Sequence, residues 1–265
     1  MATKEEFPLA ACHFDRDRFA VRVGTAELGA GHLHGSAVYG GNSLIWDLSF
    51  TGDAPPLFLF PARLYETALP RAKSLVGLPM AVYNGSLTVN GEAVDIREWV
   101  GSQNHNWGTR HTDWYAWAQV AGFDNHPESF LEVASARLKI GPLWTPYLTP
   151  LVLRHRRREL RINRLMQTLR ARVTFRYFSW TFACTAGPLS IAGRIDAPPD
   201  AFVGLRYYNP PGATKHCLNS KIAACELRLI DAVHNPGGVE VLTSAHRAGF
   251  EILTDDTGHG IEVRV

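Results

Sequence analysis

The sequence predicts an all-β protein made of two packed antiparallel units, each a barrel or a sandwich. Apolar and polar residues alternate with a period of two in many segments, among them Phe19–Gly24, Ser43–Phe50 and Ser179–Thr185. This alternation is typical of strands with one buried face. Turn residues separate such segments, for example Asn84-Gly85 and Asn90-Gly91. No long segment has the apolar spacing of a helix, so a parallel sheet with crossover helices is not expected.

Two short helical turns and one crossover complete the expected architecture. Helical turns are expected only near Tyr65–Leu75 and at Pro198–Phe202. The strands fall into two groups joined by Gly141–Pro146, whose two prolines indicate a rigid connection. The predicted domains are therefore residues 1–145 and 146–265.

Composition and charge exclude several classes of protein. Of the 265 residues, 46% are hydrophobic and 20% are charged, which excludes a disordered or fibrous chain. The net charge of +2 argues against a nucleic-acid-binding protein. No apolar stretch approaches the ~18 residues of a membrane helix, and Glu5 and Glu6 stand where a signal peptide needs an apolar core. We expect a cytoplasmic protein with no integral membrane segment, and leave peripheral membrane contact and oligomeric state open.

Cysteines and histidines provide little sign of a metal site. The four cysteines are far apart in the chain and form no CxxC pair, so free and mostly buried thiols are expected. His32 and His34 would share one face of a strand, a spacing that metal sites use, but no third ligand is evident. Motifs of hydrolases, kinases and dehydrogenases are missing as well. No metal and no cofactor are therefore expected.

One stretch of the chain is strongly basic. Residues Arg154 to Arg176 include nine arginines and one acid, Glu159. Because apolar residues alternate with the charged ones in 159–165 and 169–173, we interpret the stretch as a strand hairpin with one face in water. The alternative is a surface for an anionic ligand group or for a partner.

The segment from Ile96 to Phe123 is the most distinctive in the chain. It contains four tryptophans, two histidines and several side-chain amides. On a strand, Tyr115, Trp117 and Gln119 would form a bulky face opposite small residues. Such a bulky face is suited to line a cavity for an apolar ligand.

This segment reads GSQNHNWGTRHTDWYAWAQVAGF and is followed by FLEVASARLKIGPLWTP. Both stretches resemble the lipocalin-like carotenoid hydratases (hydroxyneurosporene synthases) and the tocopherol cyclase-like proteins. The stretches VRVGTAELGAGHLHG, LFPARLYETALPRAKSLVGLP and FVGLRYYNPPGATKHCLNSKIAAC are similar to the same proteins. The resemblance implies two consecutive lipocalin-like β-barrels or sandwiches, an apolar cavity within or between them, and no redox cofactor. It also implies hydration or cyclisation of isoprenoids, as some members perform.

Three residues near the aromatic run are candidates for acid–base catalysis. Asp113 could act as a general acid if the surrounding rings raise its pKa, or could be a turn carboxylate. His105 could relay a proton, or could be a hydrogen-bonded structural histidine. Glu98 is the second acid candidate, with an ion pair to Arg97 as its alternative. The predicted substrate-binding residues are Trp107, Trp114, Tyr115, Trp117, Asn104, Asn106 and Lys215, the rings also being suited to shield a cation.

These features lead to a functional hypothesis with an alternative. The leading hypothesis is a cofactor-free hydratase, cyclase or isomerase that acts by acid–base catalysis on an apolar, isoprenoid- or polyene-like small molecule. The alternative is a non-catalytic carrier of a lipid-like ligand, and a structural module is the third interpretation. An inward-pointing buried carboxylate would favour the enzyme, a wholly apolar pocket would favour the carrier, and a filled interior would favour the structural or interaction module.

Overall fold

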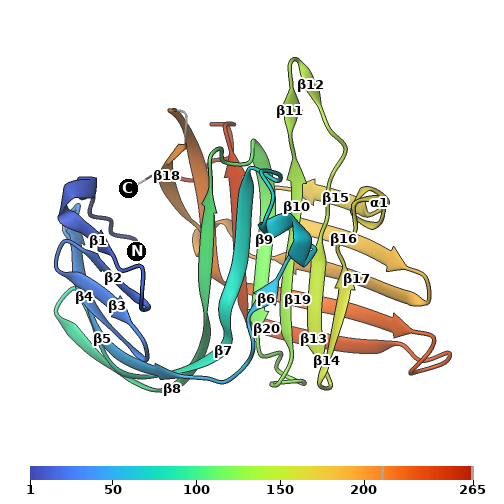
Figure 1. The fold of residues 1–265 in the computed structure, drawn as a ribbon, viewed down its shortest axis with the longest axis horizontal. Helices are drawn as coiled ribbons and strands as arrows, with labels where there is room; N and C mark the ends of the chain where they lie inside the picture. Colours follow the sequence, from blue (N-terminus) through green and yellow to red (C-terminus); the bar gives the residue numbers. More distant parts are fainter. Residues whose placement is uncertain (210–211, 264–265) are drawn as a thin grey trace.

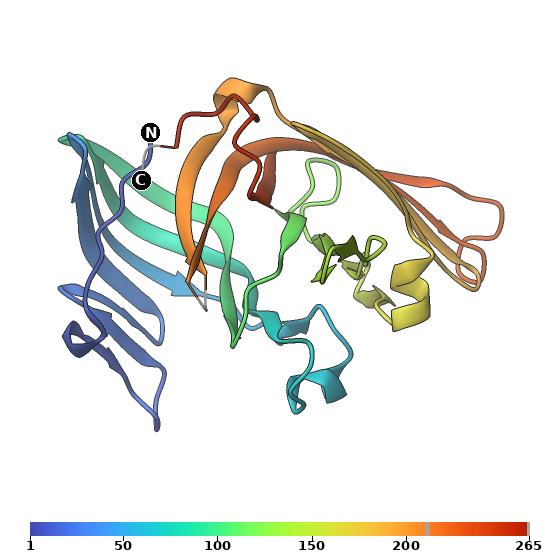
Figure 2. The same ribbon diagram turned by 90° about the horizontal axis from the view of Figure 1, so that it is seen from above.

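The chain folds into two large antiparallel β-sheets (Figure 1). The computed structural model describes residues 1–209 and 212–263. The predicted all-β class is confirmed. Seen from above, the second sheet curves strongly around its own interior, and the first sheet lies along one side of it (Figure 2).

The first sheet contains eight strands in the order β1-β2-β3-β4-β5-β7-β6, with β8 also paired to β7. Its strands are β1 (Cys12–Phe14), β2 (Ala20–Val23), β3 (Ala26–Gly29), β4 (His32–Tyr39), β5 (Asn42–Thr51), β6 (Leu57–Phe58), β7 (Ala72–Val89) and β8 (Glu92–Gly108). The long strands β7 and β8 extend from the first sheet to the middle of the molecule (Figure 1).

The second sheet contains ten strands in the order β14-β13-β10-β9-β20-β19-β17-β16-β15, with β18 also paired to β19. Its strands are β9 (Trp114–Ala121), β10 (Phe130–Arg137), β13 (Leu151–His155), β14 (Arg158–Ile162), β15 (Arg172–Arg176), β16 (Ser179–Ala186), β17 (Leu189–Asp196), β18 (Val203–Asn209), β19 (Ala213–Asp231) and β20 (Glu240–Thr254). A separate hairpin, β11 (Lys139–Ile140) with β12 (Leu143–Trp144), projects from it.

The chain passes from the first sheet to the second between Gly108 and Trp114. The proline-containing segment 141–146 instead connects β10 to β13 within the second sheet, by way of the β11-β12 hairpin. The chain therefore changes sheets well before residue 145, the predicted domain boundary. The division into domains 1–145 and 146–265 stays a prediction.

One of the predicted Asn-Gly turns forms and the other does not. Asn90 and Gly91 join β7 to β8 with left-handed backbones, at φ of 50° and 88°, as the hairpin signal predicts. Asn84-Gly85 is not a turn but an irregular position inside β7. A Cβ on Gly85 would lie 2.2 Å from the Asp47 carbonyl oxygen, so this glycine serves close strand packing. The predicted turn at Asn209–Gly212 includes Pro210 and Pro211, which lie outside the described residues.

Helical structure is short throughout the described part of the chain. Single 3₁₀ turns occur at η1 (Leu9–Ala11), η2 (Ala62–Tyr65) and η3 (Pro199–Ala201), and one α-helical turn occurs at α1 (Leu165–Leu169). The turns η2 and η3 lie close to the two predicted positions. Helix α1 is not among the predicted helical turns, and it lies in the link between the two alternating runs 159–165 and 169–173.

The prediction that 159–165 and 169–173 pair with each other as a hairpin is wrong. Strand β14 pairs with β13, whereas β15 pairs with β16. Between them, the Gln167 side chain accepts a hydrogen bond from the Arg164 backbone N–H at 3.1 Å and caps the helical turn. In the sequence, this capped turn is visible only as a break in the alternation at Met166-Gln167-Thr168, which a hairpin turn would show as well.

Ion pairs occupy several arginines of the basic stretch. Glu159 binds both Arg154, at 2.7 Å, and Arg161, at 2.5 Å. Arg158 binds Asp231 at 2.7 Å, and Arg154 also donates to the Pro55 carbonyl at 2.6 Å. Arg154, Arg158 and Arg161 thus serve internal contacts of this chain.

The main hydrophobic core lies inside the curve of the second sheet. Ala116, Ala118 and Val120 of β9 are fully buried there, together with large side chains such as Trp180 and Phe250. Small residues on β9 allow these large rings to pack closely against the sheet. The aromatic segment thus supplies its small face to the core.

A second, smaller cluster joins the two sheets. Leu57 of β6 and Val76 of β7 pack against Phe130 of β10 and Val152 of β13, and all four are buried. We call these four residues the junction cluster. They press the first sheet against the outer face of the second, the face opposite the main core.

All four cysteines are free thiols, and Cys184, Cys217 and Cys225 are buried, as expected. Within the described residues, no helix combines the length and the apolar character needed to cross a membrane. The cytoplasmic location stays a prediction.

We expect Gly193→Ala to destabilise the second sheet. Gly193 lies opposite Phe182 in the β16-β17 pairing, and a Cβ there would approach the Phe182 ring to 2.3 Å. Overpacking of this kind costs about 1–3 kcal/mol, measurable by urea unfolding. The control is Gly77→Ala on β7, where the nearest atoms are 3.7 Å away. Equal effects at both positions would contradict the packing described here, and Phe182→Leu should relieve part of the cost in the double variant.

Candidate functional site: a buried polar stripe between the sheets

Polar side chains form a band across the outer face of the second sheet, where the first sheet covers it. Gln119 lies opposite Glu132 in the β9-β10 pairing, and Trp117 lies opposite Glu251 in the β9-β20 pairing. Directly paired residues point to the same face of a sheet, so these side chains are neighbours. We call the whole set the inter-sheet stripe; it consists of Glu132, Gln119, Trp117, Tyr115, Glu251 and Asn219.

Glu132 is the most unusual member of the stripe. It is only 3% exposed, and its partners are neutral: Trp117 Nε1 donates to one carboxyl oxygen at 2.8 Å and Gln119 Nε2 to the other at 2.6 Å. Burial raises the pKa of Glu132 to about 7, because the two hydrogen bonds offset only part of the cost of burying a charge. A carboxyl with this pKa both donates and accepts a proton near neutral pH.

A second carboxyl, Glu251, lies on the other side of Trp117. Tyr115 donates its hydroxyl hydrogen to one Glu251 oxygen, and Asn219 Nδ2 donates to the other at 2.7 Å. Burial, followed by the nearby Glu251 charge, raises the pKa of the Tyr115 hydroxyl well above its ordinary value. Tyr115 therefore stays a neutral hydrogen-bond donor, and the stripe contains two carboxyls in different surroundings.

Strand β8 of the first sheet covers the stripe. Ser102 donates its hydroxyl hydrogen to the Gln119 side-chain oxygen, and Gln119 donates to Asn104 Oδ1 at 3.0 Å. Asn104, a predicted binding residue, is thus connected to Glu132 through one amide. These bonds hold an edge of the first sheet against the second.

His105 and Trp107, also on β8, belong to an aromatic ladder beside the stripe. Their rings stack with centroids 5.0 Å apart, and Trp107 lies 5.8 Å from the ring of Tyr65. Burial raises the pKa of Tyr65 to about 12, and the charge of Glu132 contributes to the shift, which places the two groups within electrostatic range. The Tyr65 hydroxyl donates to the Ser74 carbonyl at 2.6 Å.

Asp113 lies at the rim of the stripe and forms a charged group of contacts. Arg110 binds its carboxylate at 2.8 Å, the Lys139 backbone N–H donates to it at 2.9 Å, and Lys215 Nζ donates to its backbone carbonyl. Burial acts to raise the pKa of Asp113, but these hydrogen bonds and charges outweigh it and hold the pKa below its usual value. A general acid that works near pH 7 needs a raised pKa, and the pKa of Asp113 is lowered.

His111 lies between this rim and the stripe. Its ring stacks on Tyr115 at 5.8 Å and meets the edge of Tyr207 at 6.3 Å. Burial lowers the pKa of His111, and its Nδ1 atom is buried without a hydrogen-bond partner. A neutral imidazole with a free nitrogen therefore faces the Tyr115 end of the stripe.

The other predicted residues lie elsewhere. Trp114 packs edge-on against Phe175, at 4.9 Å between ring centroids, on the core side of the second sheet. Glu98 is exposed at a left-handed position of β8, where its backbone N–H donates to Asn84. Asn106 is exposed on the same strand. The structure thus gathers Trp117, Tyr115 and Asn104 at the stripe, and places His105, Trp107, Asp113 and Lys215 around it.

Two open cavities lie outside the stripe. One of about 610 Å³ lies between the N-terminal segment, β4 and β18, and its lining includes Phe7, Tyr39, Arg206 and Tyr208. The other, of about 480 Å³, is next to α1 and is lined mainly by polar residues such as Asn163. No predicted site residue lines either cavity, so a shared ligand cavity for the aromatic residues stays a prediction.

Glu132 and Glu251 were missed in the sequence. Glu132 stands alone in the apolar run Phe130-Leu-Glu-Val-Ala, and Glu251 in Gly249-Phe-Glu-Ile-Leu. An isolated acid in a strand with apolar residues on both sides is the signal that could have pointed to them. Their proximity to Trp117 depends on strand pairing, which the sequence does not specify.

Comparisons with known proteins agree with this fold. No protein-family model matches the chain. Two uncharacterised proteins from Mycobacterium tuberculosis, of strains CDC 1551 / Oshkosh and H37Rv, are each 30% identical over 188 residues, which cover 71% of this chain. The matched part spans 56% of those proteins, so the chain corresponds to little more than half of their length.

Two solved structures have similar folds. Kievitone hydratase from Nectria haematococca matches with a TM-score of 0.51 and 14% identity, over 85% of this chain and 65% of that one. A protein assigned as AttH from Nitrosomonas europaea matches with a TM-score of 0.50 and 12% identity, over 94% of this chain and 73% of that one. At this level of identity, the matches show a shared all-β, lipocalin-like fold.

Burial of Glu132 predicts an unusual dependence of stability on pH. The folded state holds the proton with a pKa of about 7 instead of 4.5, so it binds more protons than the unfolded state within this window. Stability should therefore fall as pH rises from about 4.5 to about 7. Relative to Glu132→Gln, the wild type should lose on the order of 3 kcal/mol across the window, at about 1.4 kcal/mol per pKa unit.

Urea unfolding at a series of pH values measures this difference. Glu226→Gln is the matched control, because Glu226 is an exposed strand carboxylate that binds Arg228 at 3.0 Å. If Glu132→Gln and Glu226→Gln show the same pH dependence relative to the wild type, Glu132 does not titrate as described.

Proposed function

We propose that the chain is a cofactor-independent enzyme of the hydratase type that performs acid–base chemistry on an apolar, isoprenoid- or polyene-like small molecule at the inter-sheet stripe. The observation that carries the proposal is Glu132, a buried carboxyl with a pKa of about 7 and neutral hydrogen-bond partners. Burying such a group costs folding free energy, and neither a lipid carrier nor a structural module needs it.

In the proposed reaction, protonated Glu132 transfers its proton to one carbon of an alkene. The π electrons form the new C–H bond, and the neighbouring carbon becomes a cation, which the ring of Trp117 stabilises through its face. Water then adds to the cation, and the oxonium ion that results releases its proton to the Glu132 carboxylate, directly or by way of Glu251, which passes the proton on to Glu132. The sum is addition of one water molecule, with the acid restored.

The same proton donor would serve cyclisation or isomerisation. If a second alkene of the substrate reacts with the cation instead of water, a ring forms; if a neighbouring carbon loses its proton, the double bond moves. The exclusion of water around Glu132 thus influences which product forms. Ser102 and Asn104, whose strand covers Gln119, control that exclusion, and substrate access requires β8 to separate from β9 at these bonds.

The fold comparison supports the reaction class. Kievitone hydratase, as its name states, is a hydratase, and it shares the all-β architecture with this chain. The predicted rim residues Asp113, His105 and Lys215 fit roles in orienting the substrate, since Asp113 is held in its charged form. Glu98 lies exposed on β8 and is the weakest of the predicted acids.

We expect Glu132→Gln to reduce turnover by about 10²-fold or more, because the amide retains the shape of the side chain and has no proton to donate. The purified chain is incubated with kievitone and with acyclic isoprenoid polyenes in ¹⁸O-labelled water, and products are analysed by mass spectrometry. Incorporation of one labelled oxygen identifies hydration, and an isomer of unchanged mass identifies cyclisation or isomerisation.

Two further variants make the test specific. Glu226→Gln, far from the stripe, should leave turnover unchanged. Asp113→Asn should reduce it less than Glu132→Gln does; a loss of 10²-fold or more in Asp113→Asn alone would make Asp113 the acid instead. If these polyenes quench tryptophan fluorescence on binding but are recovered without conversion, the carrier hypothesis replaces the enzyme.

A further inference from the structure

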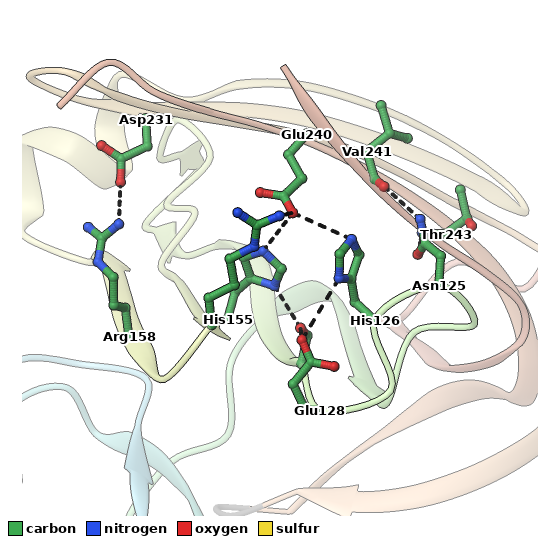
Figure 3. Close-up of polar contacts among 11 residues, drawn as sticks. Asn125, His126, Glu128, His155, Arg158, Asp231, Glu240, Val241 and Thr243 are labelled. Atoms are coloured by element: carbon green, nitrogen blue, oxygen red, sulfur yellow. Dashed lines mark hydrogen bonds and ion pairs between the residues drawn. The ribbon is translucent and has the colours of Figure 1, made fainter. Parts of the chain in front are cut away.

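Three side chains from distant parts of the sequence meet at one end of the second sheet (Figure 3). His126 comes from the β9-β10 loop, His155 ends β13 and Glu240 begins β20. Glu240 Oε1 lies 3.0 Å from His155 Nε2 and 3.4 Å from His126 Nε2, and the ligand atoms of all three residues lie within 4.8 Å of one another. We propose that these three residues form a binding site for a divalent transition-metal ion, with Zn²⁺ as the best match.

The distances fit a tetrahedral ion. Bonds of about 2.0–2.2 Å to zinc place neighbouring ligand atoms roughly 3.3–3.5 Å apart in a tetrahedron, close to the 3.0 and 3.4 Å between Glu240 Oε1 and the two histidine nitrogens. The two histidine nitrogens, which lie within 4.8 Å of each other, would take up this spacing when the ion binds. Two imidazoles and one carboxylate are a common ligand set for zinc, which leaves a fourth position for water. The three groups therefore converge in a geometry that a zinc ion can accept.

The second observation is a pair of buried atoms without hydrogen bonds. His155 Nε2 and Glu240 Oε1 are both buried and 3.0 Å apart, and neither makes a hydrogen bond of acceptable geometry. Glu240 Oε1 does form an ion pair with the Arg156 guanidinium at 2.7 Å. The His155 side chain is 3% exposed. Buried polar atoms are nearly always hydrogen-bonded, and two that face a common point are what a bound cation would satisfy.

The outer contacts of the site also suit a metal. Ser129 Oγ bonds to His155 Nδ1 at 2.7 Å, which fixes the ring so that Nε2 faces Glu240. Glu128 lies 3.8 Å from His126 Nδ1, which places a negative charge beside that ring without a hydrogen bond to it. The His126 and His155 rings meet edge to face, with centroids 4.9 Å apart, so both present nitrogens toward Glu240.

Arg156 is the one contact that opposes a cation. Its guanidinium binds Glu240 Oε1 at 2.7 Å, but its side chain is 66% exposed and can move into solvent. The arginine therefore competes with the ion for the same oxygen. This competition yields a test that separates a metal site from an ion-pair cluster.

The site lies apart from the inter-sheet stripe. His155 follows Leu151 and Leu153 along the core-facing side of β13, whereas Glu132 points to the opposite face of the sheet. An ion here would tie the β9-β10 loop and the ends of β13 and β20 together. The proposal is thus independent of the proposed function.

Zinc binding to the full chain, first stripped of metal with a chelator, is measured by isothermal titration calorimetry. We expect one ion per chain, a rise in melting temperature with zinc, and, with Co²⁺ in its place, the intense visible bands of tetrahedral coordination. Glu240→Gln and His155→Ala should each weaken binding by about 100-fold or more, since losing even an outer contact costs 10–100-fold. Glu240→Gln preserves side-chain shape, so it reports on ligation even if His155→Ala fails to fold.

Two control variants test whether zinc binds at these three residues. His32→Ala with His34→Ala removes an exposed pair whose rings lie 5.3 Å apart, and it should leave zinc affinity unchanged. Arg156→Ala should tighten zinc binding at least several-fold, because it removes the competing cation. No saturable zinc binding, or binding that is unaffected by Glu240→Gln, would overturn the proposal and leave an ion-pair cluster only.

Discussion

The second sheet buries its inner face along its length and its outer face only at β9, β10 and β13, and this partial cover organises the candidate site. Its inner face closes around a core of large side chains such as Trp180 and Phe250. Its outer face is covered at β9, β10 and β13 by the first sheet, through Leu57 and Val76 packed on Phe130 and Val152. Burial of apolar side chains in this junction, worth about 1.5–3 kcal/mol each, holds the sheets together. Polar side chains under this cover, above all Glu132 and Gln119, are therefore removed from water.

Glu132 owes its properties to that contact. It lies two residues from Phe130 on β10 and opposite Val152 on β13, so the junction cluster that joins the sheets also dehydrates its carboxyl. The neighbouring Trp117 and Gln119 satisfy its oxygens without supplying a positive charge. The raised pKa of Glu132 thus results from the packing of the two sheets. The same burial lowers the free energy of unfolding as pH rises toward 7, so the reactive carboxyl costs stability.

The two faces of the second sheet carry different chemistry. The outer face holds carboxyls paired with neutral donors, which suits proton transfer. At the loop end of the inner face, His155 and Glu240 converge with His126, which suits a cation. Since successive residues of a strand point to opposite faces, one sheet keeps the two sets of groups apart. Neither set contains a residue that the sequence predicted as catalytic, and Glu132 and Glu251 are acids isolated in otherwise apolar sequence.

The sequence by itself determined the all-β class and the two faces of the segment Trp114–Ala121, because the alternation of side chains is a local property of a strand. It therefore identified Trp117 and Tyr115, which do belong to the inter-sheet stripe.

The sequence did not determine strand order, the capped turn α1 within the basic stretch, or the position at which the chain passes between the sheets. These depend on contacts between residues far apart in sequence. Asp113 shows the same limit: its place among aromatic residues predicted a raised pKa, whereas Arg110 and the Lys139 backbone hold the pKa down. Only tertiary structure decided which carboxyl is dehydrated without a compensating charge, since dehydration is a property of the packed sheets and not of neighbours in the chain.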